Sequence, residues 1–147
     1  MLFRSGPKAK EAALPLANAL EDKNPAMRVQ AAKALWKVKP QPQLILPVLM
    51  AALQEDLIPL KIEAASGLGQ MGWEAEAASG PLVQCLKEKD PKLRVAAANA
   101  LGQIGPVARN SVQPLLDTLK DKEQEVRNAA SRAIKQIDPD VAGKLGF

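Results

Sequence analysis

The stretch PLVQCLKEKDPKLRVAAANALGQIG, residues 81–105, determines the architecture of the chain. A leucine- and proline-containing segment leads into a short charged turn, and an alanine-rich segment follows. Counted from Leu86, apolar or small residues stand 7, 11, 14, 15 and 18 positions later, which is the spacing of one face of an α-helix. The stretch therefore predicts two helices joined by a tight turn, and the second helix is amphipathic.

This pattern recurs every 33 residues. Leu20, Leu53, Leu86 and Leu119 mark four copies, each with an acid 2 positions later and a base 8 positions later. The acids are Asp22, Glu55, Glu88 and Asp121, the bases are Arg28, Lys61, Arg94 and Arg127, and the apolar residues at position 7 are Met27, Leu60, Leu93 and Val126. Four copies in one register predict four helical hairpins, at about 7–39, 40–72, 73–105 and 106–138, with a tail at 139–147.

The hairpins are expected to stack, because one hairpin cannot bury its own apolar face. We therefore predict an all-α fold, an α-α superhelix or solenoid in a single domain over residues 6–147. The first helix of each hairpin, helix A, is assigned to the convex layer, and the second, helix B, to the concave layer. A proline recurs in each helix A, where it either kinks the helix or lies in the first turn of a shortened one. These prolines are Pro15, Pro47, Pro81 and Pro114.

A period of about 33 residues also fits ankyrin and tetratricopeptide repeats, whose patterns use His and Tyr respectively. The chain has no His and no Tyr. Its pattern Leu-Pro-Leu, Ala-Leu-Glu-Asp, Arg, Ala-Ala, Ala-Leu instead resembles the short HEAT repeat of bacterial HEAT-repeat proteins and phycobilin lyase subunits, over residues 6–139. The resemblance implies that the turn acids and the helix-B bases form a structural ladder through the stack. The second copy departs from the pattern at Pro47, which is shifted by one position, and at Lys61, which replaces Arg.

Composition gives little support to an enzyme. Without His the chain lacks the commonest general base and metal ligand, and a single cysteine, Cys85, can form no internal disulfide and is expected to be buried. The glycines in GLGQMG follow a helix rather than a strand, so we interpret Gly67, Gly69 and Gly72 as packing and helix-ending residues rather than a dinucleotide loop. We expect no catalytic residues, no metal and no cofactor.

The helix-B face is the predicted binding surface. Its exposed positions stand 13 and 17 residues after each marker leucine, and none of them is acidic. These residues are Lys33, Lys37, Ser66, Gln70, Asn99, Gln103, Arg132 and Gln136. Trp36 joins them, because it stands where other copies carry Gly69, Gly102 and Lys135, and Trp is enriched at interaction hot spots; its other interpretation is a cover over the seam between the first two hairpins. Trp73 is expected to pack over a loop.

The predicted function is a non-enzymatic scaffold that binds a protein or peptide on this concave face. Two alternatives stay open. One is nucleic-acid binding with a surface like that of HEAT-like DNA glycosylases, although the net charge is only +4 and the bases on the face are few. The other is chromophore handling of the bilin-lyase type. Deoxyhypusine hydroxylase, a HEAT-repeat metalloenzyme, is excluded because it requires His.

The start of the chain is interpreted as the boundary with a preceding repeat that the sequence does not contain. Gly6-Pro7 matches Gly105-Pro106, three periods later, and is interpreted as the end of a helix B from a preceding repeat. Residues 1–5 are expected to be non-native or disordered, since residues 2–5 can be encoded by the end of a common sequencing adaptor. We therefore expect a C-terminal fragment, monomeric, without a membrane segment and with the cytoplasm favoured, whose short apolar tail after Asp138 caps the stack.

Overall fold

A computed structural model describes residues 7–147, and the expectations for residues 1–6 lie outside this range. Residues 7–147 form helices and turns and no strand. The helices are α1 (Pro7–Ala19), α2 (Pro25–Val38), α3 (Pro42–Ala52), α4 (Ile58–Met71), the 3-10 helix η2 (Gly72–Ala78), α5 (Ser79–Cys85), α6 (Pro91–Ile104), the 3-10 helix η3 (Gly105–Ser111), α7 (Val112–Thr118), α8 (Gln124–Ile137) and α9 (Pro139–Lys144).

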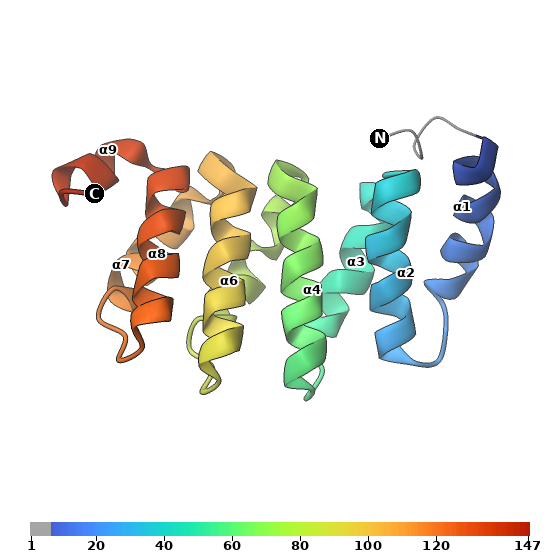
Figure 1. Ribbon diagram of the computed structural model, residues 1–147, viewed down its shortest axis with the longest axis horizontal. Helices are drawn as coiled ribbons and strands as arrows, with labels where there is room; N and C mark the ends of the chain where they lie inside the picture. Colours follow the sequence, from blue (N-terminus) through green and yellow to red (C-terminus); the bar gives the residue numbers. More distant parts are fainter. Residues whose placement is uncertain (1–6) are drawn as a thin grey trace.

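The predicted all-α solenoid is confirmed. The second helices of the hairpins, α2, α4, α6 and α8, stand side by side in one layer, with α3 and α7 behind them (Figure 1). Each second helix packs on the first helix of its own hairpin and on the second helices of its neighbours. The helix-B layer therefore presents a continuous row of helices on one face of the molecule.

The recurring prolines take both predicted positions. Pro15 lies inside α1 and Pro47 inside α3, whereas Pro81 and Pro114 lie in the first turn of the short helices α5 and α7. In these last two hairpins the preceding 3-10 helix departs from helical geometry at equivalent alanines, so helix A starts later. A proline in a first turn removes no helical hydrogen bond, which makes the shortened helix the less strained solution.

Two glycines allow neighbouring helices of the helix-B layer to pack closely, as predicted for Gly69. A Cβ atom at Gly69 would lie 3.2 Å from the Cα of Ala100, and one at Gly102 would lie 3.0 Å from the Cα of Ala133. Both glycines stand 16 positions after their marker leucine and face the next hairpin. Gly72 ends α4 with a φ of 62°, which L side chains rarely adopt, so its predicted role at the helix end is also confirmed.

The core is built from the predicted helix-B positions, with one exception. Leu93, Leu101 and Ile134 are fully buried, and Cys85 is buried as expected. Met27 is 49% exposed, although its counterparts in later hairpins are buried. Met27 therefore does not join the buried apolar face that its place in the repeat predicts.

The two remaining expectations concern Trp73 and the tail. Trp73 follows Gly72 at the start of η2 and is 68% exposed, so the prediction that its ring packs over a loop is wrong. The tail forms α9, which lies against α8 and buries Ala142, while Leu145 and Phe147 remain exposed.

Candidate functional site

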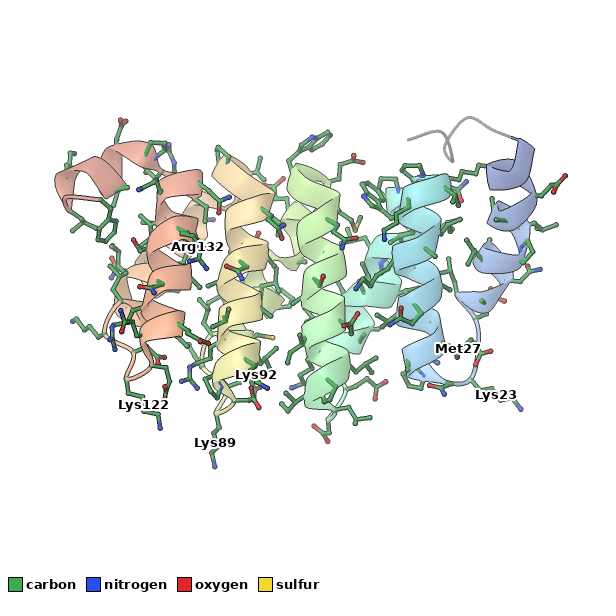
Figure 2. The ribbon with its side chains drawn as sticks, in the orientation of Figure 1. Lys23, Met27, Lys89, Lys92, Lys122 and Arg132 are labelled. Carbon is green, nitrogen blue, oxygen red and sulfur yellow. The ribbon has the colours of Figure 1, made fainter. Side chains whose placement is uncertain are left out.

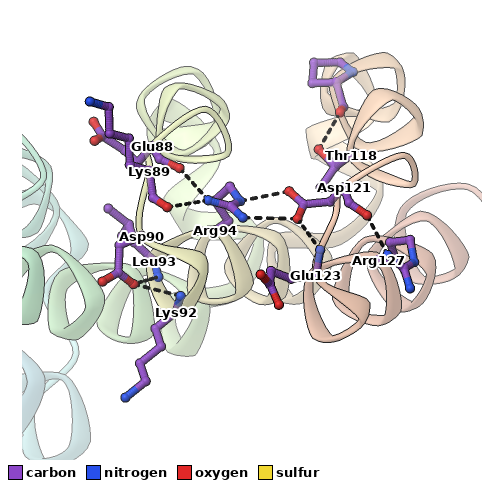
Figure 3. Close-up of polar contacts among 11 residues, drawn as sticks. Glu88, Lys89, Asp90, Lys92, Leu93, Arg94, Thr118, Asp121, Glu123 and Arg127 are labelled. Carbon is purple, nitrogen blue, oxygen red and sulfur yellow. Dashed lines mark hydrogen bonds and ion pairs between the residues drawn. The ribbon is translucent and has the colours of Figure 1, made fainter.

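Arg94 links two hairpins through a buried ion pair. Its Nε lies 2.8 Å from Oδ2 of Asp121 and its Nη2 lies 3.1 Å from Oδ1, in a fork-to-fork arrangement (Figure 3). Its Nη1 also donates to the backbone oxygens of Glu88 at 2.9 Å and Lys89 at 2.7 Å. One guanidinium thus joins the turn of its own hairpin to the turn of the next, a role that its planar set of donors fits.

The other turn acids and bases follow the same rule, in which the base of one hairpin faces the acid of the next. Arg28 Nη2 lies 3.8 Å from Glu55, and Lys61 Nζ lies 3.4 Å from Glu88. These pairs are longer and their carboxylates are more exposed than that of Asp121. Arg127 donates through Nη1 to the backbone oxygen of Asp121 at 2.6 Å. Asp22 accepts the backbone N–H of Asn24 at 2.8 Å.

The stability contributed by the Arg94–Asp121 ion pair depends on pH, because the Asp121 carboxyl titrates. Burial raises the pKa of its carboxyl, but hydrogen bonds from Arg94 and from the backbone N–H of Glu123 outweigh burial, and the pKa is lowered overall. In the unfolded chain this carboxyl would have a pKa of about 3.9. Because the pKa is lower in the folded chain, the ionised carboxylate stabilises the fold at pH values above about 3.9. This stabilisation is lost as the pH falls through the folded-state pKa.

We therefore expect Asp121→Asn to destabilise the chain by about 2–3 kcal/mol at neutral pH, since it leaves Arg94 without a charged partner. The difference from the wild type should shrink as the pH falls below about 4. Urea unfolding measured across this range gives the comparison. The exposed carboxylate of Asp117, on the same hairpin, provides the control Asp117→Asn, which should run parallel to the wild type. A difference for Asp121→Asn that stays constant with pH would contradict the assignment.

A groove of about 570 Å³ crosses the helix-B face over α4, α6 and α8. Its lining consists of Ile62, Ser66, Ala96, Asn99, Gln103, Arg132, Lys135 and Gln136. The predicted binding face thus contributes the polar residues Ser66, Asn99, Gln103, Arg132 and Gln136, which the structure brings together. The repeat pattern does not predict three of the lining residues. Ile62 and Ala96 lie about one helical turn before the predicted positions, and Lys135 is only the counterpart of Trp36 in that pattern.

The α2 end of the predicted face is arranged differently. Lys33 Nζ lies 2.6 Å from Oε2 of Glu63, and the Lys33 side chain is only 17% exposed. The hydrogen bond from Lys33 lowers the pKa of Glu63. None of the predicted positions of the face is acidic, but Glu63, which lies outside them, reaches Lys33 from the next helix.

The remaining predicted residues of the binding face also stay outside the groove lining. Trp36 is half-buried against the core, while Lys37 and Gln70 are exposed. Trp36 stands at the position where α4 and α6 carry glycine, and α2 touches α4 less extensively than α4 touches α6. The groove accordingly begins at α4 rather than at α2.

The α8 end of the groove is cationic. Arg132 Nη2 lies 3.4 Å from Oδ1 of Asn99, and no described carboxylate forms an ion pair with Arg132 or Lys135. Figure 2 shows Arg132 on the front of α8, within the helix-B layer and well above the turns that carry Lys89 and Lys122.

Two further findings concern the part of the chain that the structure describes. Its Cys, Asp and Glu side chains form no group of three that could hold a metal ion. None of its helices is both long and apolar enough to cross a bilayer.

The stacked hairpins and the grooved face define an α-solenoid of the helix-hairpin class. Residues 79–144, which span α5 to α9, match the family model of HEAT repeats, so this part of the chain resembles HEAT repeats. Comparison with curated proteins gave no match. HEAT repeats commonly serve as scaffolds for protein interactions and are generally not enzymes.

Proposed function

We propose that the chain binds a protein partner by holding an extended peptide segment in the groove over α4, α6 and α8. The observation that carries this proposal is the groove itself, because it crosses three neighbouring helices of one layer and combines convergent polar side chains with the apolar side chains of Ile62 and Ala96. A comparable arrangement at protein interfaces places apolar contact at the centre and polar groups around it.

The lining suits a peptide backbone. The side-chain amides of Asn99, Gln103 and Gln136 can each donate and accept hydrogen bonds, as can the hydroxyl of Ser66, so together they match alternating N–H and C=O groups. Ile62 offers an apolar surface for a side chain of the ligand.

The groove is also held rigid before a ligand arrives. Its three helices are fixed relative to one another by the close approaches at Gly69 and Gly102, and by the Arg94–Asp121 pair near the turns. A site that is already ordered loses less conformational entropy on binding than a mobile one.

Asn99→Trp tests the proposal, because it places a large ring in the middle of the groove without changing charge. The tagged chain is used to capture partners, the captured protein is identified and purified, and its affinity is measured for each variant. We expect Asn99→Trp to weaken binding by more than about tenfold, since the ring blocks the central part of the lining.

Gln113→Trp is the matched control, because Gln113 is exposed on α7 in the other helical layer. It should bind as the wild type does, and circular dichroism should show equal helicity for all three proteins. Equal affinities of the wild type and Asn99→Trp would refute the groove as the binding site. Duplex DNA binding that weakens with salt and is lost in Asn99→Trp would assign the groove to nucleic acid instead.

A further inference from the structure

The groove carries positive charge at one end, and no described acidic side chain neutralises it. None of its lining residues is acidic, and both of its cations, Arg132 and Lys135, lie on α8. They stand three positions apart on one helix, a spacing at which like charges repel. No described carboxylate pairs with either of them, so the repulsion is not offset within the described residues.

On the α2 side of the same face, in contrast, the basic side chain is paired with an acid. Lys33 also lies on a helix-B face, but Glu63 of the neighbouring helix lies 2.6 Å from its ammonium group. The lysine and arginine side chains near the hairpin turns, Lys61 and Arg94, are likewise paired with acids of the next hairpin. Arg132 instead reaches only the amide oxygen of Asn99, at 3.4 Å.

Apolar surface lies toward the other end of the groove, beside the hydroxyl of Ser66 on α4. Ile62 on α4 and Ala96 on α6 line it, and both are only partly buried. Neighbouring packed helices are about 8–10 Å apart, so the distance from α4 to α8 is about 20 Å. An extended peptide covers that distance with about six residues.

Resting on the proposed function, we infer that the groove takes an anionic peptide segment, with a carboxylate against Arg132 and Lys135 and an apolar side chain over Ile62 and Ala96. The two anchors are about four to five residues apart in the ligand. The carboxylate is supplied either by an Asp or Glu side chain or by the end of the partner chain, and the same two cations accept both.

The test uses the full chain and a phage-displayed library of random dodecapeptides. Phage that bind Asn99→Trp are removed first, and the remaining phage are selected for binding to the wild type. We expect the selected peptides to carry Asp or Glu about four to five residues from an apolar residue. Synthetic copies are then measured by fluorescence anisotropy. Replacing their acids with Gln or Asn should weaken binding about tenfold, and raising the salt concentration should weaken it further.

The variant Arg132→Gln/Lys135→Gln should lower the affinity for the acidic peptide about tenfold and remove the preference over its neutral copy. Lys89→Gln/Lys122→Gln is the matched control, because it removes the same charge from two exposed lysines at the hairpin turns (Figure 2). It should bind as the wild type does. Peptides with a free or an amidated C-terminus distinguish a terminal carboxylate from a side-chain one.

Three results would overturn the inference. Selected peptides that are neutral or basic and bind in a groove-dependent manner would reject the anionic ligand and leave the proposed function standing. Acidic peptides that bind Arg132→Gln/Lys135→Gln as well as the wild type would reject the two cations as the anchor. A selection that yields no groove-dependent peptide would reject the inference, and the partner's affinity for Asn99→Trp then decides the proposed function separately.

Discussion

Arg94→Ala should lower the free energy of unfolding by about 3–5 kcal/mol, the loss typical of breaking a buried ion pair from one side. The Arg94 and Asp121 side chains are only 8% and 13% exposed, so the carboxylate left behind is poorly solvated. The substitution also removes the donor of two hydrogen bonds to the backbone oxygens of Glu88 and Lys89. Thermal unfolding followed by circular dichroism should show a melting temperature about 10 °C lower.

Arg28→Ala is the matched control for this prediction. Arg28 occupies the equivalent position in the first hairpin, but it lies 3.8 Å from Glu55 and the two side chains are 29% and 44% exposed. Solvent screens such a pair, and the loss should be about 1 kcal/mol or less. Equal losses for Arg28→Ala and Arg94→Ala would mean that burial of the pair does not determine its contribution. An unchanged melting temperature for Arg94→Ala would reject the ladder as a source of stability.

Gly102→Ala should destabilise the chain by about 1–3 kcal/mol, although alanine is the better helix former. The new methyl group would lie 3.0 Å from the Cα of Ala133, so α6 and α8 must move apart. It would also meet the side-chain oxygen of Gln136, which can rotate away. Gly102→Val should cost more, since a branched side chain needs a larger separation of the two helices. Urea unfolding at neutral pH measures both.

Gly80→Ala is expected to have the opposite sign. Gly80 lies in α5, and nothing lies within 4 Å of the position that its Cβ would take. The substitution should therefore stabilise the chain by up to about 1 kcal/mol, through helix propensity and a less flexible unfolded state. If Gly102→Ala were stabilising as well, the close approach of α6 and α8 would not constrain the size of the residue between them.

The sequence predicts the repeated elements of the fold well, because each hairpin repeats one local pattern. The spacing of residues in the sequence is enough to predict the marker leucines, the core positions of the helices B and the close packing at Gly69. It could not choose between the two positions for the prolines, because that depends on where each helix A starts. Pro15 and Pro81 share a place in the repeat but lie in helices of different length.

The candidate site was less predictable than the fold, because its contacts run between hairpins. Glu63 pairs with Lys33 across 30 positions, which is not the repeat period, so comparing equivalent positions never brings the two together. Lys135 was overlooked for a related reason, since its counterparts Gly69 and Gly102 are buried between helices and gave no indication of an exposed cation. Ile62 and Ala96 resemble core residues in sequence, and only packing shows that they remain partly open.

The residues 16 positions after each marker leucine give the stack uneven mechanical properties. Gly69 and Gly102 bring α4, α6 and α8 into close backbone contact, so these helices should respond to load as one stiff block. Trp36 occupies the same position on α2, where the joint to α4 is less extensive. Bending or stretching of the solenoid should therefore concentrate at that joint, and the groove over α4, α6 and α8 should keep its shape while the first hairpin swings.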